Sequence, residues 1–263
     1  VHTMHLKTLL AGLSLRSATA DMETEITRIS YDSRTTAPGD VFVAMTGFAT
    51  DGHAYIGKAV AAGAAAVVCE RPPEDSSVPY VLVENSRRAL AVMAANYYGH
   101  PADSMTMVAV TGTNGKTTTT YLLKAILEQE LGAKVGLIGT NQDLIGDEVV
   151  PTERTTPESL ELQELFARMR SAGCTHVVME ASSHALALDR VYGIHYAVGI
   201  FTNLTQDHLD FHKTMEAYCD AKAILFQNCD VGVCNADDPW TERLLQNAAC
   251  RQYFYAAHAA ADL

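Results

Sequence analysis

Short apolar runs alternate with segments of helical periodicity along most of the chain. In the first hundred residues the pattern predicts strands at 40–45, 65–70 and 79–84, an Ala-rich helix that ends near Gly63, and a helix over about 86–98. A short apolar run between turn signals is typical of a buried strand. This part of the chain is therefore expected to form a small α/β unit.

The same alternation continues beyond a break in the helical pattern. Gly99 and Pro101 place a domain boundary near residue 101. Further strand-like runs, separated by helical patterns, lie at 108–110, 134–139, 176–181, 196–203 and 231–237. Continuous apolar strands between helices predict a mostly parallel sheet covered on both faces, with ligands at the carboxyl ends of its strands. We expect two domains, 1–100 and 101–263.

The amino-terminal segment 5–20 combines Lys7, a short apolar run and an Ala-Thr-Ala ending. This pattern occurs both in secretory signals and in amphipathic helices. Because Arg16 interrupts the apolar run, we favour an amphipathic first helix and a cytoplasmic protein. No apolar run approaches the roughly 20 residues that a membrane-spanning helix needs.

Composition narrows the possible functions. The chain has 263 residues and is 48% hydrophobic, enough for two domains with cores of their own. With 19 basic and 31 acidic residues its net charge is −12, which disfavours nonspecific nucleic-acid binding but leaves room for a local anion pocket. The six cysteines include no C-x-x-C pair, which indicates reduced thiols. We expect a monomer without nucleic-acid or membrane partners.

The clearest candidate chemistry lies at 107–127, where an apolar strand runs into a Gly-rich turn and then into a helix. Apolar residues recur along that helix at amphipathic spacing, namely Leu122, Leu123, Ile126 and Leu127. The usual phosphate-loop pattern would have a glycine where this chain has Val110, so a shortened variant is predicted. The alternative is a glycine turn with a solvent-exposed lysine.

The turn has the residues that a phosphate cradle requires. Gly112 and Gly115 let backbone N–H groups approach phosphate oxygens, and the new helix points its positive end at them. Lys116 can reach the β- and γ-phosphates, and the Thr117 hydroxyl suits Mg²⁺. The predicted nucleotide-binding residues are Gly112, Thr113, Asn114, Gly115, Lys116, Thr117 and Thr118. The chain is thus expected to bind a nucleoside triphosphate.

Polar residues also follow the next strands. Glu180 could hold Mg²⁺ or could balance a helix dipole, and we favour the first because an acid on a buried strand is costly unless it is used. His208 and His212, spaced i, i+4, suggest zinc only weakly, because a third ligand is not evident. A magnesium-associated histidine or ordinary surface polarity are the alternatives.

A helix is predicted at 218–226 with Tyr218, Ala221 and Leu225 facing inward. Lys222 lies beside this apolar stripe. Composition alone makes it a surface lysine whose stem covers apolar neighbours.

Five motifs in this order resemble the Mur ligases, which build the peptide of the bacterial cell wall: TGTNGKTTT, ERTTPE, MEASSHAL, FTNLTQDHLDFH and YCDAKAILF. The amino-terminal YDSRTTAPGDVFVAMTGFATDGHAYI resembles the uridine-nucleotide domain of the branch that adds the third amino acid, diaminopimelate or lysine, to UDP-N-acetylmuramoyl-L-alanyl-D-glutamate. The similarity spans about residues 26–240. It implies an α/β fold, with a small amino-terminal uridine-nucleotide domain followed by a P-loop-type ATPase domain on a mostly parallel sheet.

The resemblance also implies a reaction. In that family ATP phosphorylates the terminal glutamyl carboxylate, and the incoming amine displaces phosphate from the acyl phosphate. The phosphoryl group neutralises a poor electrophile and provides a leaving group, while Mg²⁺ and Lys116 offset the developing charge. The expected ligase serves peptidoglycan precursor synthesis in the cytoplasm, and its partners are the UDP-muramoyl-dipeptide and an amino acid.

Site residues carry over position by position. The resemblance assigns Lys116, Glu180, His208 and Lys222 to catalysis, and it assigns magnesium to Thr117, Glu180, His208 and a Lys222 that CO₂ has carbamylated. It places Tyr31, Ser33, Phe48, Ala49 and Thr50 near the uridine diphosphate, and Thr155, Thr156, Ser182 and Arg190 near the muramoyl-peptide. A guanidinium fork at Arg190 suits carboxylate or phosphate. Leu188 and Arg154 depart from the glutamine and asparagine of some members, so those contacts are not transferred.

The family's carboxy-terminal domain, which selects the amino acid, lies outside the resemblance. We therefore expect the chain by itself to be inactive. A folylpolyglutamate synthase is an alternative that the DSR-x-x-x-PGD-x-F-V-A segment disfavours. A catalytically silent nucleotide or UDP-sugar binding module is the other alternative, and the retained Lys116, Glu180, His208 and Lys222 disfavour it.

Overall fold

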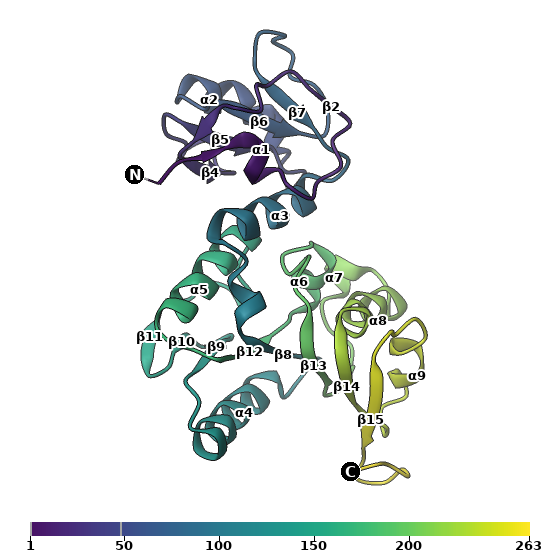
Figure 1. Ribbon diagram of the computed structural model, residues 1–263. Coiled ribbons are helices and arrows are strands. Elements are labelled where there is room, and N and C mark those ends of the chain that lie inside the picture. Colours follow the sequence, from purple (N-terminus) through teal and green to yellow (C-terminus); the bar gives the residue numbers. More distant parts are fainter. Residues whose placement is uncertain (1, 48) are drawn as a thin grey trace. The chain divides into compact units, whose positions relative to one another are not determined.

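The chain folds into two compact units in the computed structural model, which describes residues 2–47 and 49–263 (Figure 1). Unit 1 is Val1–His100 and unit 2 is Pro101–Leu263. Helix α3 (Ser86–Tyr98) closes unit 1, and Gly99 follows it in the left-handed conformation with φ of 74°. Glycine is favoured at this position because it has no Cβ to clash there.

Unit 1 is built on a five-stranded sheet of order β2-β7-β6-β5-β4, in which β2 and β7 are antiparallel and the other neighbours parallel. Its strands are β2 (Ser17–Ala18), β4 (Arg28–Ser30), β5 (Asp40–Val43), β6 (Ala66–Cys69) and β7 (Tyr80–Leu82). A separate antiparallel pair joins β1 (Met4–His5) to β3 (Glu25–Ile26). The remaining helices are α1 (Leu6–Leu9), η1 (Gly52–Tyr55) and α2 (Ile56–Ala61). Phe42 and Val67 of the sheet pack with Ile56 and Ala59 of α2.

The predicted amphipathic first helix is wrong beyond its first turn. Helix α1 has four residues, and Gly12 then takes a φ of 86° that suits glycine. The chain continues as an edge strand instead, because the N–H groups of Arg16 and Thr19 bond to the carbonyls of Leu82 and Tyr80.

Unit 2 contains an eight-stranded sheet of order β11-β10-β9-β12-β8-β13-β14-β15. Its strands are β8 (Thr106–Thr111), β9 (Val135–Ile138), β10 (Asp143–Ile145), β11 (Glu148–Val150), β12 (His176–Glu180), β13 (Tyr196–Phe201), β14 (Cys229–Asn235) and β15 (Arg251–Tyr255). The six strands from β9 to β15 in this order are parallel, and β10 and β11 add an antiparallel hairpin at one edge. The predicted α/β fold with a mostly parallel sheet is confirmed, whereas the hairpin was not predicted.

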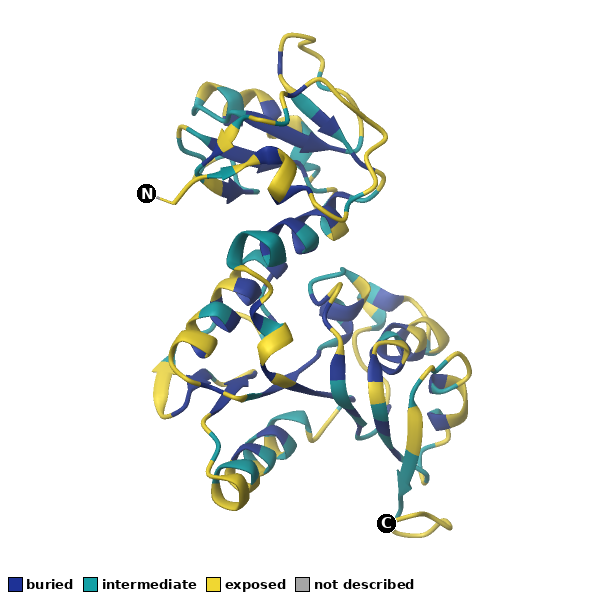
Figure 2. Ribbon diagram, viewed as in Figure 1, coloured by how far each residue is buried: buried dark blue, intermediate teal, exposed yellow. Residues whose placement is uncertain are grey.

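Helices cover the two faces of this sheet unequally. They are η2 (Pro101–Ser104), α4 (Lys116–Leu131), α5 (Ser159–Ser171), α6 (Ser183–Ala187), α7 (Leu209–His212), α8 (Met215–Ala223), η3 (Ile224–Gln227) and α9 (Thr241–Leu244). The main core packs one face against α5, α6, α8 and α9, and it appears as the dark interior of Figure 2. On the other face Val108, Val135 and Val178 pack with Leu123 and Leu127 of α4.

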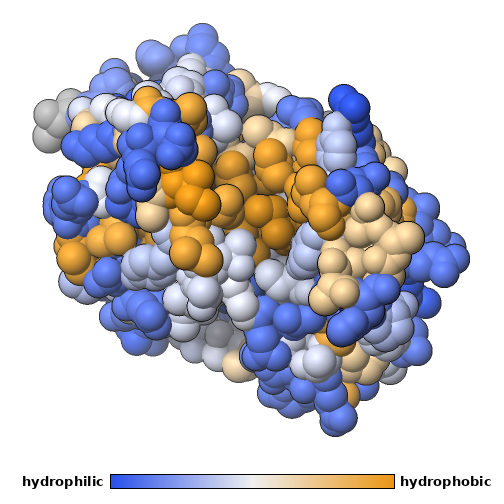
Figure 3. Space-filling model, turned by 90° about the horizontal axis from the view of Figure 1, so that it is seen from below, coloured by the Kyte–Doolittle hydropathy of each residue, from blue (hydrophilic) through white to orange (hydrophobic). Residues whose placement is uncertain are grey.

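Helix α4 buries less of its apolar surface than its sequence predicts. Leu122 and Ile126 are 58% and 55% exposed. Apolar side chains gather on the side of the molecule seen in Figure 3. Leu122 and Ile126 are exposed because only Leu123 and Leu127, among the four apolar positions predicted for this helix, point at the sheet. No helix in the described ranges has the length and apolar character to cross a bilayer.

Candidate nucleotide and substrate site

The loop between β8 and α4 has the backbone that a phosphate cradle needs. Gly112 and Gly115 have φ of 148° and 90°, values that residues other than glycine rarely adopt. A Cβ on Gly112 would lie 1.8 Å from Oγ1 of Thr202. Glycine at this position is therefore required both by conformation and by space.

The end of β13 holds this loop in place. Asn114 donates its backbone N–H to Oδ1 of Asn203 at 3.0 Å and accepts from Oγ1 of Thr202 at 2.7 Å. Thr113 donates its N–H to the Asn203 carbonyl at 2.8 Å, and its hydroxyl lies 3.1 Å from the hydroxyl of Tyr218. The loop is thus shaped before any ligand arrives.

Two lysines share one carbonyl oxygen of the loop. The Nζ atoms of Lys116 and Lys222 donate to the Gly112 carbonyl at 2.6 and 3.0 Å. Lys222 is 1% exposed, so the surface position that composition suggested for it is wrong. Burial and the nearby Lys116 lower the pKa of Lys222 to about 7, and burial also lowers the pKa of Lys116.

Glu180 lies at the end of β12 beside the loop and is 1% exposed. Its Oε1 accepts from the Thr117 hydroxyl at 2.8 Å and from the Thr140 N–H at 3.2 Å. Its Oε2 accepts from the Thr140 hydroxyl at 2.8 Å. A carboxylate and a hydroxyl oxygen are thus side by side at the helix start, an arrangement suited to a hard divalent cation.

The residues predicted to contact the muramoyl-peptide lie near Glu180 and connect to its backbone carbonyl and to its partner Thr140. The Thr155 hydroxyl lies 3.1 Å from that of Thr140. The Thr156 hydroxyl donates to the Glu180 carbonyl at 2.9 Å and accepts from the Ser182 N–H at 3.2 Å. The structure therefore brings these predicted residues together with Glu180.

Arg190 joins this group through a buried ion pair. Its Nε lies 2.8 Å from Oε2 of Glu158, and both side chains are largely buried. Its Nη1 donates to the Thr156 carbonyl at 3.3 Å. Glu158 offsets much of the guanidinium charge. Arg190 therefore offers a ligand an oriented hydrogen-bond donor with little net positive charge.

The two histidines have different surroundings. The His208 imidazole is 47% exposed, lies 3.5 Å from the Asp207 carboxylate, and meets the ring of His184 at 4.9 Å. His212 is buried and pairs with the Ser183 hydroxyl at 2.9 Å. Within the described residues no three His, Cys, Asp or Glu side chains are grouped to hold a metal, so the zinc alternative gains no third ligand.

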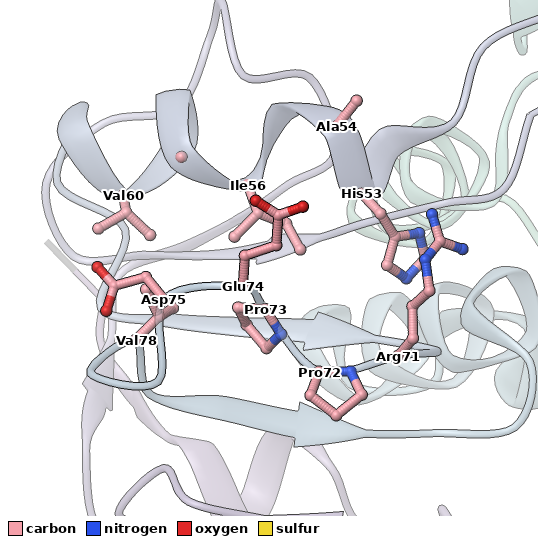
Figure 4. Close-up of a pocket in the computed structure, with 11 residues that line it drawn as sticks. His53, Ala54, Ile56, Val60, Arg71, Pro72, Pro73, Glu74, Asp75 and Val78 are labelled. Atoms are coloured by element: carbon pink, nitrogen blue, oxygen red, sulfur yellow. The ribbon is translucent and has the colours of Figure 1, made fainter.

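The predicted uridine-nucleotide residues lie in unit 1. Tyr31 and Ser33 follow β4, and Ala49 and Thr50 follow β5. Because β4 and β5 are parallel neighbours, both segments leave the sheet at the same edge. Phe48 lies outside the described residues. A pocket of about 580 Å³ lies beside α2, but its lining residues are other ones, such as His53, Ile56 and Arg71 (Figure 4).

Comparison with known proteins assigns the chain to a family. The model described as Mur ligase middle domain matches residues 110–263. The chain belongs to the Mur ligase family. A second model, described as Mur ligase family, catalytic domain, matches residues 25–98 of this Mur ligase chain.

Individual Mur ligase relatives cover the chain from end to end. The UDP-N-acetylmuramoyl-L-alanyl-D-glutamate--2,6-diaminopimelate ligase of Clostridium tetani is 47% identical over 99% of this chain and 54% of its own length. A solved ligase of the same name shares 26% identity over 99% of this chain and 54% of its own, with a TM-score of 0.80. The chain therefore spans about half the length of the curated relatives it matches. Folylpolyglutamate synthase of Mycobacterium tuberculosis shares only the fold, at 16% identity over 64% of this chain and 46% of its own with a TM-score of 0.52.

The residues of this Mur ligase chain fit the ligands that the family uses. The absence of a Cβ at Gly112 lets the loop pack directly against Thr202, which gives it the shape of a phosphate cradle. The oxygens of Thr117 and Glu180 are the hard donors that Mg²⁺ prefers. Three residues at this place were not predicted: Thr140, Tyr218 as a partner of the loop, and Asp207, whose charge acts on both lysines. Thr140 could have been found, because it directly follows the predicted strand at 134–139.

Proposed function

We propose that this chain serves the ATP-dependent addition of the third amino acid to UDP-N-acetylmuramoyl-L-alanyl-D-glutamate, through an acyl phosphate, in peptidoglycan precursor synthesis in the cytoplasm. The observation that carries the proposal is the contact between Thr117 and Glu180 at 2.8 Å, directly beside a glycine loop with two lysines on its carbonyl. Of the two amino acids, diaminopimelate is supported by the names of the relatives.

Each residue at this edge of the sheet then has a part in the reaction. The loop N–H groups and Lys116 bind the phosphates of ATP, and Thr117 and Glu180 would hold the magnesium that neutralises their charge. Thr140 keeps the Glu180 carboxylate oriented through two hydrogen bonds. Thr155, Thr156, Ser182 and Arg190 orient the substrate so that its terminal carboxylate faces the γ-phosphate.

Lys222 is the residue proposed to carry a carbamate that, with His208 nearby, supports a second magnesium. Carbamate formation joins the uncharged amine nitrogen to the carbon of CO₂ and releases one proton. The buried Nζ of Lys222 favours the uncharged amine. Labelling with ¹³CO₂ tests this directly: wild type should show a ¹³C carbamate resonance that Lys222→Ala lacks, and a spectrum without that resonance in wild type contradicts the assignment.

Unit 1 is proposed to bind the uridine diphosphate with residues that follow β4 and β5. Tyr31 and Ser33 lie on the first of these segments and Ala49 and Thr50 on the second. The relatives named for a UDP-linked substrate match this unit along with unit 2, which favours a ligase of this branch over a folylpolyglutamate synthase.

Calorimetric titration with Mg-ATP tests the nucleotide site. Lys116→Ala should weaken binding at least about tenfold, because it removes a charge-assisted contact to phosphate. Lys58→Ala, an exposed lysine of unit 1, is the matched control and should leave the affinity unchanged. Equal affinities for wild type and Lys116→Ala would refute the assignment. A catalytically silent module would bind Mg-ATP in the same way, so this titration tests the nucleotide site and leaves catalysis untested.

A further inference from the structure

The turn after β5 is closed by short-range contacts of its own. Thr46 and Asp51 form a β-bridge, and the Gly47 N–H donates to the Thr50 carbonyl at 2.8 Å. The turn includes Ala49 and Thr50, two residues of the proposed uridine-diphosphate site. Whatever fixes the turn therefore decides whether that site is formed before the ligand arrives.

His53 connects the turn to the end of β6. Its side chain is 5% exposed. Its Nδ1 lies 2.7 Å from Oδ1 of Asp51, and its Nε2 lies 2.9 Å from the backbone nitrogen of Glu70. Arg71, drawn beside the His53 ring in Figure 4, pairs with the other oxygen of Asp51 and holds the pKa of that carboxyl well below its ordinary value. Asp51 is thus ionised and can only accept hydrogen bonds.

These partners decide which ring nitrogen carries the proton. The Glu70 N–H can only donate, so Nε2 has to be unprotonated to accept from it. The Asp51 carboxylate can only accept, so Nδ1 has to carry the proton. If both ring nitrogens carried a proton, the N–H at Nε2 would face the backbone N–H of Glu70, and no hydrogen bond could form between them.

The side-chain carboxylate of Glu70 closes a ring of contacts around the turn. It accepts from the N–H and hydroxyl of Ser86, at the start of α3, at 2.9 and 2.6 Å. It also accepts from the Thr46 hydroxyl at 3.4 Å. The ring runs from Thr46 through Asp51, His53 and Glu70 back to Thr46. The His53 side chain uses both of its ring nitrogens in this ring, Nδ1 toward Asp51 and Nε2 toward Glu70.

We propose that His53, neutral and protonated at Nδ1, is a positioning residue that holds the described residues of the turn, 46–47 and 49–51, in the shape that receives the uridine diphosphate. The proposal rests on the function proposed above for unit 1. His53 is not itself one of the residues predicted to contact the uridine diphosphate. It acts on the turn through its contacts with Asp51 and Glu70. Removing its acceptor atom leaves the Glu70 N–H without a partner and opens the ring opposite the β-bridge.

The tautomer is tested on the wild-type protein. Nitrogen-15 spectra of the histidine ring should show a protonated Nδ1 and an unprotonated Nε2. The reverse tautomer, or a ring protonated on both nitrogens at neutral pH, would overturn the proposal. This measurement does not depend on whether any variant folds.

Two variants test the positioning role. In His53→Gln the amide oxygen can take the place of Nε2 and accept from the Glu70 N–H, whereas His53→Asn keeps a donor for Asp51 but is too short to reach Glu70. Titration with UDP should give a Kd within about threefold of wild type for His53→Gln and at least about tenfold weaker for His53→Asn. The Kd for Mg-ATP should be the same in all three proteins.

The outcomes separate the two proposals. If wild type does not bind UDP, the proposed function of unit 1 is wrong, and the positioning role is wrong with it. If wild type binds UDP and the two variants bind it equally well, the positioning role alone is wrong. A parallel loss of UDP and Mg-ATP binding in His53→Asn would mean general unfolding and would also overturn the selective role.

Discussion

Asp143 at the start of β10 is a carboxylate in a place unfavourable to its charge. It is 3% exposed, and burial raises its pKa to about 6 from 3.8, although the Gly139 N–H donates to it at 3.2 Å. A carboxyl group whose pKa is higher in the folded than in the unfolded protein destabilises the fold when it is ionised. Its cost in free energy of unfolding is therefore absent at low pH, grows from about pH 4 to pH 6, and is complete above that. With about 1.4 kcal/mol for each pKa unit, the penalty is about 3 kcal/mol at pH 8 and about 1 kcal/mol at pH 4.5.

Asp143→Asn should remove this penalty, because its amide oxygen can still accept from Gly139 and carries no charge. The variant should therefore gain about 2 kcal/mol more in free energy of unfolding at pH 8 than at pH 4.5, whatever pH-independent cost the amide adds. Trp240 is the single tryptophan of the chain and lies in unit 2, so its fluorescence during urea unfolding follows the unit that contains Asp143.

Asp147→Asn is the matched control, since Asp147 is an exposed carboxylate in the neighbouring turn. It should shift the free energy of unfolding by less than about 0.5 kcal/mol at either pH. A stability difference between Asp143→Asn and wild type that is the same at both pH values would refute the reasoning.

Three further substitutions test other parts of unit 2. Gly112→Ala should abolish Mg-ATP binding by calorimetry while circular dichroism stays native, because its Cβ would collide with the Thr202 hydroxyl 1.8 Å away; retained affinity would mean that the loop can move aside. Thr140→Val should weaken Mg-ATP binding about fivefold, since it removes one of the hydrogen bonds that orient Glu180, and an unchanged affinity would take Thr140 out of the site. Gly136→Ala should cost about 1–3 kcal/mol in urea unfolding, because its Cβ would lie 2.4 Å from the sulfur of Met169; a smaller loss would show that the flexible Met169 gives way.

Much of the fold could be predicted because buried parallel strands are apolar along their whole length. The run at 176–181 and strand β12 (His176–Glu180) nearly coincide for this reason. Strand β10 was not found, since it begins with the buried Asp143, and edge strand β15 has the mixed pattern Arg-Gln-Tyr-Phe-Tyr. Neither short sequence shows the continuous apolar run or the regular alternation from which a strand is predicted.

The candidate site was predictable where function follows directly from position in the chain. Glu180 and the glycine loop come directly after strands, so the strand-end rule applies to both. The burial of Lys222 could not be derived from composition, because the carbonyl that accepts from its Nζ belongs to Gly112, 110 residues away in sequence. Only the resemblance to a family placed it in the site.

The contact of Lys116 with the loop carbonyls has a consequence for how a ligand arrives. An ammonium in water has to lose part of its hydration shell before it can touch phosphate. Lys116 already lies against the carbonyls of Gly112 and Thr113, so folding has removed those waters in advance. An incoming anion then has to displace a neutral carbonyl from the ammonium, which a dianionic phosphate does more readily than a weakly charged ion. The resting loop thus ranks ligands by charge density before any base or sugar is recognised.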